Sequence, residues 1–301
     1  MTEKRIPVRT PSGTFEVWTK TLGSNPRARV LLLHGGPAAT HEYFESVGPA
    51  LAAAGIEAIY YDQLGSFASD QPEDATLWTL ERFVDEVEQV RVALGLDSEN
   101  FIILGHSWGG LLGMEYALTH GQNMKALIIS NMMSSIPAYD RFAREVIMPT
   151  IDPVALARIQ ELEAAEDYGN PEYEELLMEH HYVNHVLRKP VDEWPEPVMR
   201  SFGHVNQSIY VPMQGPSELG SSPNATLYNW DRFADLPRIE VPTLVIGAEH
   251  DTMDPAHMRA MAEVLPNGTY LHCPNGSHMA MWDDAEVYEA GVIEFICGLD
   301  A

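Results

Sequence analysis

The sequence predicts an α/β fold with a mostly parallel sheet, helices on both faces of the sheet and an inserted helical cap. Three observations predict it. Short, wholly apolar runs alternate with stretches of helical apolar spacing, as is typical of parallel strands buried between helices. This alternation stops near residue 132 and resumes near residue 239. The residues between these points are acidic and rich in proline, with no obvious strand.

The elements expected before residue 132 follow from these patterns. The expected strands are short apolar or alternating runs, and they cover residues 15–20, 30–33, 56–61, 101–104 and 126–130. The expected helices have apolar residues at helical spacing, and they cover residues 41–54, 77–94 and the stretch after Ser107 that reaches His120. Gly95 directly follows the second helix, which is a typical helix end.

The rest of the chain contains helix starts and two further strands. Asp152-Pro153 and Asn170-Pro171 each place a capping residue before proline, which predicts helix starts in the middle segment. The expected later elements are strands at 243–247 and 269–273 and helices from Asp254-Pro255 to about 265 and from 283 or 284 to 298. We therefore expect a core over 1–132, a helical cap over 133–238 and the second part of the core over 239–301.

Charge and composition restrict the partners. The chain has 301 residues and a formal net charge of −26, from 44 acidic and 18 basic residues, which argues against nucleic acid and anionic membranes as partners. Solubility explains most of this excess, although it also suits a cationic substrate such as a free amine. No apolar run approaches membrane-spanning length, and Cys273 and Cys297 lack metal-type spacing. We expect a cytoplasmic protein with free thiols, and no oligomeric state is predicted.

Residues 105–109, Gly105-His106-Ser107-Trp108-Gly109, match the pattern G-x-S-x-G between an expected strand and an expected helix. In that context the pattern predicts a nucleophile elbow, a strained turn that exposes the serine. Glycines on either side of the serine allow the strand and helix to pass closely. The alternative interpretation is a simple glycine-containing connection.

Candidate partners for Ser107 follow two later strands, at the sheet edge where parallel strands carry a site. Asp251 follows the strand at 243–247, and His278 follows the strand at 269–273. The order Ser, Asp, His is that of an α/β-hydrolase triad, in which the histidine takes the serine proton and the carboxylate orients the histidine. The candidates that we set aside are Glu249, which comes slightly early, Asp254, which suits a helix cap, and His257 and His272, which lie inside elements.

The tetrahedral intermediate of such a reaction needs two N–H donors. One should come from Trp108, the residue after the nucleophile, and the other from His34-Gly35-Gly36-Pro37 after the early strand. Gly36 is our choice for the second donor.

A metal or nucleotide cofactor is not predicted. His181 and His185 have a spacing that can chelate zinc, but the HExxH pattern and a clear third ligand are missing. A solvated or pocket-facing helix explains these histidines better. The elbow glycines do not form a dinucleotide fingerprint.

Several segments together resemble the proline iminopeptidases (prolyl aminopeptidases), and the resemblance spans nearly the whole chain. The segments are His34-Gly35-Gly36-Pro37, Tyr61-Asp62-Gln63-Leu64-Gly65 with Ser69, Gly105-His106-Ser107-Trp108-Gly109-Gly110, Gly215-Pro216-Ser217-Glu218, Trp230-Asp231-Arg232, and Gly276-Ser277-His278 with Trp282. The resemblance implies a cytosolic serine peptidase that releases an N-terminal proline or small apolar residue from short peptides or amino-acid amides. It also implies that Glu218 recognises the free α-amine of the substrate.

Three positions depart from the family pattern. Family members often have a second Glu where this chain has Thr252, and glycines where it has Ala38 and Phe67. The alternative hypothesis therefore keeps the triad but changes the substrate to an ester, a lactone or an aminoacyl group on a carrier. A non-catalytic binding protein with a hydrolase pocket is a third hypothesis, and the apparently complete triad argues against it.

Overall fold

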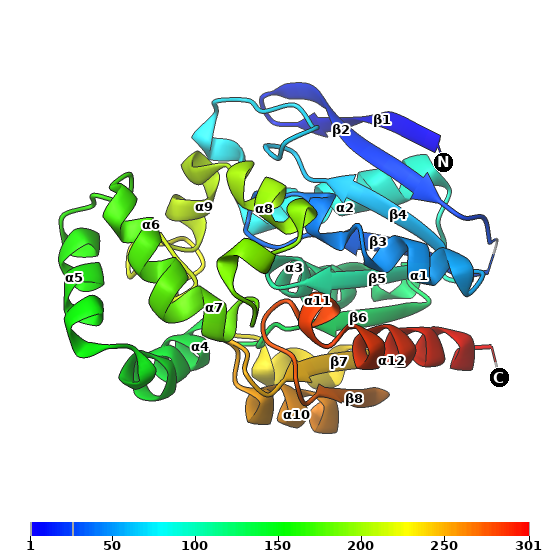
Figure 1. Ribbon diagram of the computed structural model, residues 1–301. Helices are drawn as coiled ribbons and strands as arrows, with labels where there is room; N and C mark the ends of the chain where they lie inside the picture. The colour runs from blue at the N-terminus through cyan, green and yellow to red at the C-terminus, as the bar shows by residue number, and fades with distance from the viewer. Residues whose placement is uncertain (1, 26, 301) are drawn as a thin grey trace.

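The computed structural model describes residues 2–25 and 27–300 of the chain. Within these residues, eight strands form one sheet in the order β1-β2-β4-β3-β5-β6-β7-β8 (Figure 1). The strands are β1 (Thr2–Thr10), β2 (Gly13–Leu22), β3 (Arg29–Leu33), β4 (Glu57–Asp62), β5 (Phe101–His106), β6 (Ala126–Ser130), β7 (Thr243–Ala248) and β8 (Gly268–Cys273). The pairs β1–β2 and β2–β4 are antiparallel and the others are parallel, which confirms the predicted fold class.

Helices separate the parallel strands and fill the segment between β6 and β7. They are α1 (Val47–Ala53), α2 (Leu80–Leu94), α3 (Trp108–His120), α4 (Ile136–Phe142), α5 (Pro153–Ala164), α6 (Pro171–Leu177), α7 (Val183–His185), α8 (Glu196–Gly203), α9 (Gln207–Met213), α10 (Pro255–Val264), α11 (Ala280–Asp283) and α12 (Ala285–Gly298). Shorter 3₁₀ or π segments are η1 (His41–Phe44), η2 (Ala75–Leu77), η3 (Gly121–Asn123), η4 (Ala143–Ile147), η5 (Met148–Thr150), η6 (Met178–Tyr182), η7 (Val191–Glu193) and η8 (Phe233–Arg238). None of the helices in the described residues is long and apolar enough to cross a membrane.

The strands alternate their side chains between two apolar layers. Leu31, Ile103 and Ile129 belong to the layer on the side of α2, α3 and α10. Leu32 and Ile128, the sequence neighbours of Leu31 and Ile129, belong to the layer on the side of α1 and α12. Successive side chains of a strand point to opposite faces, so a strand covered on both sides is apolar throughout. This is why the short apolar runs of the sequence identified the parallel strands.

One strand of the structure was not predicted, and two predicted helices differ from the structure. The long antiparallel strand β1 has no predicted counterpart, because only Ile6 and Val8 of this strand are buried and its pattern is therefore weak. The expected helix at 41–54 is divided into η1 and α1. The helix expected from residue 77 begins at Leu80, because the Thr79 side chain caps it by accepting a hydrogen bond from the Arg82 N–H.

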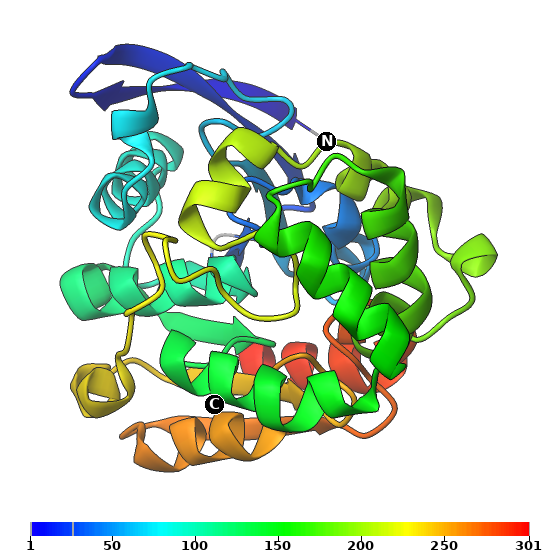
Figure 2. The same ribbon diagram turned by 90° about the vertical axis from the view of Figure 1, so that its left-hand side faces the viewer.

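Helices α4–α9 gather at one end of the sheet and lie to its left in Figure 1. Figure 2, which turns that side toward the viewer, shows them in front of the strands. The segment begins and ends close together in space, because Ser135 and Asp231 form an isolated β-bridge. Its helix starts at Pro153 and Pro171 are capped by Asp152 and Asn170, as predicted. We propose 133–238 as the bounds of this cap. The proposed core ranges end at residues 1 and 301, which lie outside the described residues.

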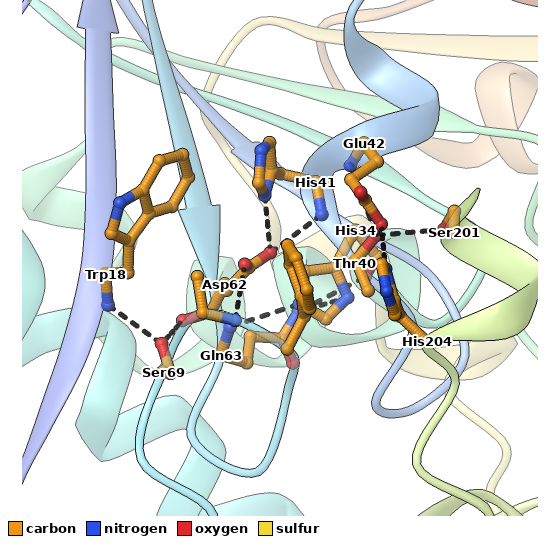
Figure 3. Close-up of polar contacts among 12 residues, drawn as sticks. Trp18, His34, Thr40, His41, Glu42, Asp62, Gln63, Ser69, Ser201 and His204 are labelled. Atoms are coloured by element: carbon orange, nitrogen blue, oxygen red, sulfur yellow. Dashed lines mark hydrogen bonds and ion pairs between the residues drawn. The ribbon is translucent and has the colours of Figure 1, made fainter. Parts of the chain in front are cut away.

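A buried carboxylate attaches the cap to the core. The side chain of Glu42, in η1, is fully buried and pairs with Arg200 of α8. It also accepts a hydrogen bond from His204 Nδ1 at 2.7 Å (Figure 3). The Thr40 hydroxyl donates to Glu42 at 2.9 Å, and it lies 3.0 Å from the hydroxyl of Ser201. A buried charge needs several such partners, so this cluster fixes α8 above the loop that follows β3.

Candidate active site

Ser107 lies in a strained turn between β5 and α3. Its φ and ψ are 54° and −126°, outside the regions that residues with a side chain usually adopt. A Cβ added at Gly105 would lie 2.1 Å from the Gly109 carbonyl oxygen, and one added at Gly109 would lie 2.0 Å from the Leu33 carbonyl oxygen. Only glycine fits at both positions, so the elbow predicted from the sequence has a steric basis.

His278 and Asp251 form a buried hydrogen-bonded pair at the carboxyl ends of β8 and β7. The His278 Nδ1 lies 2.8 Å from Asp251 Oδ1, and both residues are buried. Burial alone would lower the pKa of His278, but the charge and hydrogen bond of Asp251 outweigh burial, with help from Glu218, and the pKa is raised. A histidine with a carboxylate on Nδ1 keeps Nε2 free to accept a proton.

Asn131, at the carboxyl end of β6, holds this acid in place. Its Nδ2 donates to Asp251 Oδ2 at 2.7 Å and to the carbonyl of Ser277 at 3.2 Å. The Met253 N–H donates to Asp251 Oδ1 at 3.1 Å, on the side of the carboxylate that faces His278. Both carboxylate oxygens therefore accept hydrogen bonds, which fix the orientation of the carboxylate toward His278. Sequence reasoning missed Asn131, although the strand-end rule could have found it.

The loop after β3 is tied to the elbow through Tyr43 and His106. The Gly35 N–H donates to the Tyr43 hydroxyl at 2.5 Å, and that hydroxyl lies 3.0 Å from His106 Nδ1. The His106 Nε2 lies 2.7 Å from the carbonyl oxygen of His278. Burial lowers the pKa of His106 well below its ordinary value, so the ring is neutral and donates from Nε2. The side chain next to Ser107 thus supports the backbone of the loop that contains His278.

Gly36, in the same loop, lines a recess that Ser107 also lines. Gly36 has φ 110°, and a Cβ there would lie 2.6 Å from the Ala39 nitrogen, so glycine is required. Gly36 lines a recess together with Ser107 and Trp108, whereas the N–H of Gly35 is taken up by Tyr43. These observations favour Gly36 over Gly35 as an oxyanion donor.

Gln63, directly after β4, connects three of the segments singled out in the sequence. It accepts a hydrogen bond from Trp108 Nε1 at 2.8 Å, and its Nε2 donates to the His34 carbonyl at 3.2 Å. The neighbouring Asp62 accepts from the His41 N–H at 2.8 Å and lies 2.9 Å from His41 Nδ1 (Figure 3). These contacts fix the loops after β3 and β4 around the elbow.

Two spaces of unequal size meet at Ser107. A small recess of about 10 Å³ lies on one side, and its apolar walls are Trp108, Leu111, Met132, Ile136, Leu227 and Met253. A cavity of about 620 Å³ lies on the other side, between the elbow and the cap helices α6, α8 and α9. Gly36 and Glu218 line both spaces, and His278 lines the cavity.

Glu218 approaches the site from the loop after α9. The Tyr210 hydroxyl donates to Glu218 Oε1 at 2.7 Å, and His181 Nε2 lies 3.0 Å from the Glu218 carbonyl oxygen. Tyr182 and Tyr139 accept hydrogen bonds from the N–H groups of Glu218 and Gly220. These contacts hold Glu218 in the wall of the two spaces that Ser107 also lines. No sequence signal identified these supporting tyrosines. They come from the cap, and the sequence does not predict how the cap packs against the core.

The remaining candidates lie elsewhere in the structure. Asp254 caps α10, as predicted, and His257 of α10 contacts Ser134 at 3.1 Å. His272 and Glu249 lie 3.5 Å apart near the end of β8. His185 Nδ1 lies 3.0 Å from the His250 carbonyl oxygen, so His181 and His185 each contact the backbone of a loop. In the described part of the chain, no three metal-ligating side chains form a cluster.

The residues that depart from the expected pattern have local consequences. Thr252 places its hydroxyl 3.3 Å from His278 Nδ1, beside the Asp251 carboxylate. Phe67 stacks on His204 at the end of α8, with ring centroids 4.0 Å apart. Ala38 has φ 61°, a left-handed conformation that glycine adopts more easily.

Comparison with known proteins agrees with this geometry. Residues 28–285 match the family model of the alpha/beta hydrolase fold. A proline iminopeptidase of Elizabethkingia meningoseptica is 53% identical over 295 residues, which cover 98% of each chain.

Two solved structures are similar over almost their whole length. The crystal structure of VinJ has a TM-score of 0.89 at 27% identity and covers 98% of this chain and 99% of that one. The proline iminopeptidase of Mycobacterium smegmatis has a TM-score of 0.85 at 28% identity and covers 99% of each chain. Together with the serine elbow, these similarities show that the chain belongs to the α/β-hydrolase fold family and, within it, to the proline iminopeptidases.

Proposed function

We propose that this protein is a serine aminopeptidase that releases an N-terminal proline or small apolar residue from short peptides or amino-acid amides. The observation that carries the proposal is the Glu218 carboxylate, which is fixed on the same wall as Ser107. A substrate ammonium that leaves water needs such a partner.

In the proposed mechanism, Ser107 Oγ attacks the acyl carbon while His278 Nε2 accepts the serine proton. The contact between Ser107 Oγ and His278 Nε2 is part of the proposal. Asp251 holds the Nδ1 proton and stabilises the charged ring, and the N–H groups of Gly36 and Trp108 bind the oxyanion. The C–N bond then breaks, and His278 gives its proton to the leaving amine. Water, deprotonated by His278, hydrolyses the acyl-enzyme and restores Ser107.

The two spaces beside Ser107 support this substrate class. The cavity has room for a short peptide, and the adjoining recess has apolar walls. Glu218 lies at the border of the recess, where it can reach an amine on the carbon next to the attacked carbonyl. An ester or lactone without an amine has no use for this carboxylate, which makes the alternative hypothesis weaker.

The expected result for Glu218→Gln is a selective loss. It should lower kcat/KM for proline p-nitroanilide by about 10- to 100-fold, the usual value of a hydrogen bond to a charged group. Hydrolysis of p-nitrophenyl butyrate, which has no amine, should change less than threefold. Glu174→Gln is the matched control, because Glu174 lines the cavity but not the recess. Equal losses on both substrates would show that Glu218 does not bind the amine.

The acidic limb of the pH profile gives a second prediction. Protonated His278 cannot accept the serine proton, so activity is present above the pKa of His278 and is lost as the pH falls through it. That pKa is raised above the ordinary value of 6.5, in part by the charge of Glu218. Glu218→Gln should therefore move the acidic limb for p-nitrophenyl butyrate to lower pH, while Glu174→Gln leaves it in place. A limb that moves upward would contradict the assignment of His278 as the base.

We also propose that the protein works in the cytoplasm, without nucleic acid as a partner. The support is the formal net charge of −26 and the two free thiols, Cys273 and Cys297.

A further inference from the structure

The walls of the two spaces beside Ser107 differ in which catalytic group they contain. Of the described residues, His278 and Met279 line the large cavity, and neither lines the recess. In acyl transfer the histidine must give its proton to the leaving nitrogen, so that nitrogen must lie on the histidine's side of the attacked carbon. The leaving amine therefore enters the cavity, which His278 lines.

The cavity is far larger than a minimal leaving group needs. At about 620 Å³ it lies within the size range of drug-sized ligand sites. The cap contributes the aromatic and apolar side chains of Tyr168, Tyr173, Leu177, Met178, Met199 and Phe202 to its wall, together with the polar side chains of Asn170, Ser201 and Gln207. A bulky apolar group that binds against these side chains removes apolar area from water, which favours its binding.

The charges on the cavity wall all have one sign. Among the described residues that line it, the carboxylates are Glu174 and Glu218, and none is Lys or Arg. A dipeptide whose second residue ends in a free carboxylate would bring a like charge into this space without a cationic partner. An amidated or aryl leaving amine avoids that cost.

We propose that the cavity between the elbow and helices α6 and α8 is a leaving-amine subsite that takes bulky, apolar and uncharged amines. This inference rests on the proposed function, and it adds a substrate class: a small N-terminal residue joined to a large amide without a nearby carboxylate. The established family membership does not specify this preference.

Size is tested with Pro-Gly-NH₂ and Pro-Phe-NH₂, since these amides place the same amide group next to the leaving nitrogen and differ mainly in bulk. We expect kcat/KM to be about tenfold or more higher for Pro-Phe-NH₂, the discrimination that an apolar pocket provides. Equal values would overturn the subsite while leaving prolyl aminopeptidase activity intact. Failure to cleave either amide would overturn both the subsite and the proposed function.

Charge is tested by placing a cation on the wall. Met199 lines the cavity and is 42% exposed, so Met199→Lys should be tolerated by the fold. It should raise the kcat/KM ratio of Pro-Phe to Pro-Phe-NH₂ by about twofold to fivefold, the range of a partly exposed ion pair. Val154→Lys is the matched control, because Val154 is 78% exposed and lies on α5 outside the cavity wall. The same change in both variants, or in neither, would overturn the proposal.

Discussion

Ser107→Ala is expected to lower kcat for proline p-nitroanilide by about 10⁵- to 10⁶-fold, as loss of a triad nucleophile does in serine peptidases. Without Oγ no acyl-enzyme can form, and only binding and the oxyanion donors remain. The fold should be preserved, because alanine keeps the Cβ that already occupies the turn at φ 54°. Steady-state kinetics and thermal unfolding of the same preparation measure both effects.

Ser66→Ala is the matched control for this variant. Ser66 is also buried, in the loop after β4, and among the described residues its hydroxyl has no hydrogen-bond partner. Its replacement should leave kcat unchanged within about twofold. Retention of more than one percent of the activity in Ser107→Ala would remove Ser107 from the role of nucleophile.

Asp251→Asn is expected to lower kcat by about 10⁴-fold, because it favours the wrong tautomer of His278. Asn131 Nδ2 donates to Asp251 Oδ2 at 2.7 Å, and an amide nitrogen there would face another donor. On the His278 side the NH₂ would face the Met253 N–H, but that contact is longer, at 3.1 Å. We therefore expect the new amide to turn its oxygen toward Asn131 and its NH₂ toward His278 Nδ1. The histidine proton then moves to Nε2, where it blocks acceptance of the serine proton.

The structure suggests a rescue for this variant. In the double variant Asn131→Asp, Asp251→Asn, the new aspartate accepts from the NH₂ group, and the amide oxygen again accepts from His278 Nδ1. The Met253 N–H, which donates to Oδ1 at 3.1 Å, would also keep its acceptor. We expect kcat to recover by at least about tenfold over the single variant, by reversal of the tautomer effect. If the double variant has the same Tm as the wild type and its kcat does not recover, the tautomer explanation is contradicted.

The sequence predicted most of the core because each local signal has a single physical cause. Fully apolar runs marked the buried parallel strands, and Gly105 and Gly109 marked a turn in which a Cβ would collide with the backbone. Parallel strands end at the same edge, which is why strand position, together with the order Ser, Asp, His along the chain, pointed to Asp251 and His278. The edge strand β1 escaped prediction because it buries only two side chains.

The cap could be predicted only as a helical segment. How its helices lie against the core depends on contacts between distant residues, such as Glu42 with Arg200 and His185 with His250. Neither residue of such a pair carries a local pattern that points to the other. The same reason explains why sequence alone indicated Glu218 only through family resemblance, and why it gave no account of the cavity.

The central claim is recognition of a free N-terminal amine by a serine peptidase site. The most direct test compares proline p-nitroanilide, its N-acetylated form and p-nitrophenyl butyrate with the purified wild-type protein. We expect kcat/KM for the free-amine anilide to exceed that of the acetylated form by about 100-fold or more, since acetylation removes the charge that Glu218 binds. Cleavage of the butyrate ester alone, with both anilides untouched, would contradict the claim and make the protein an esterase.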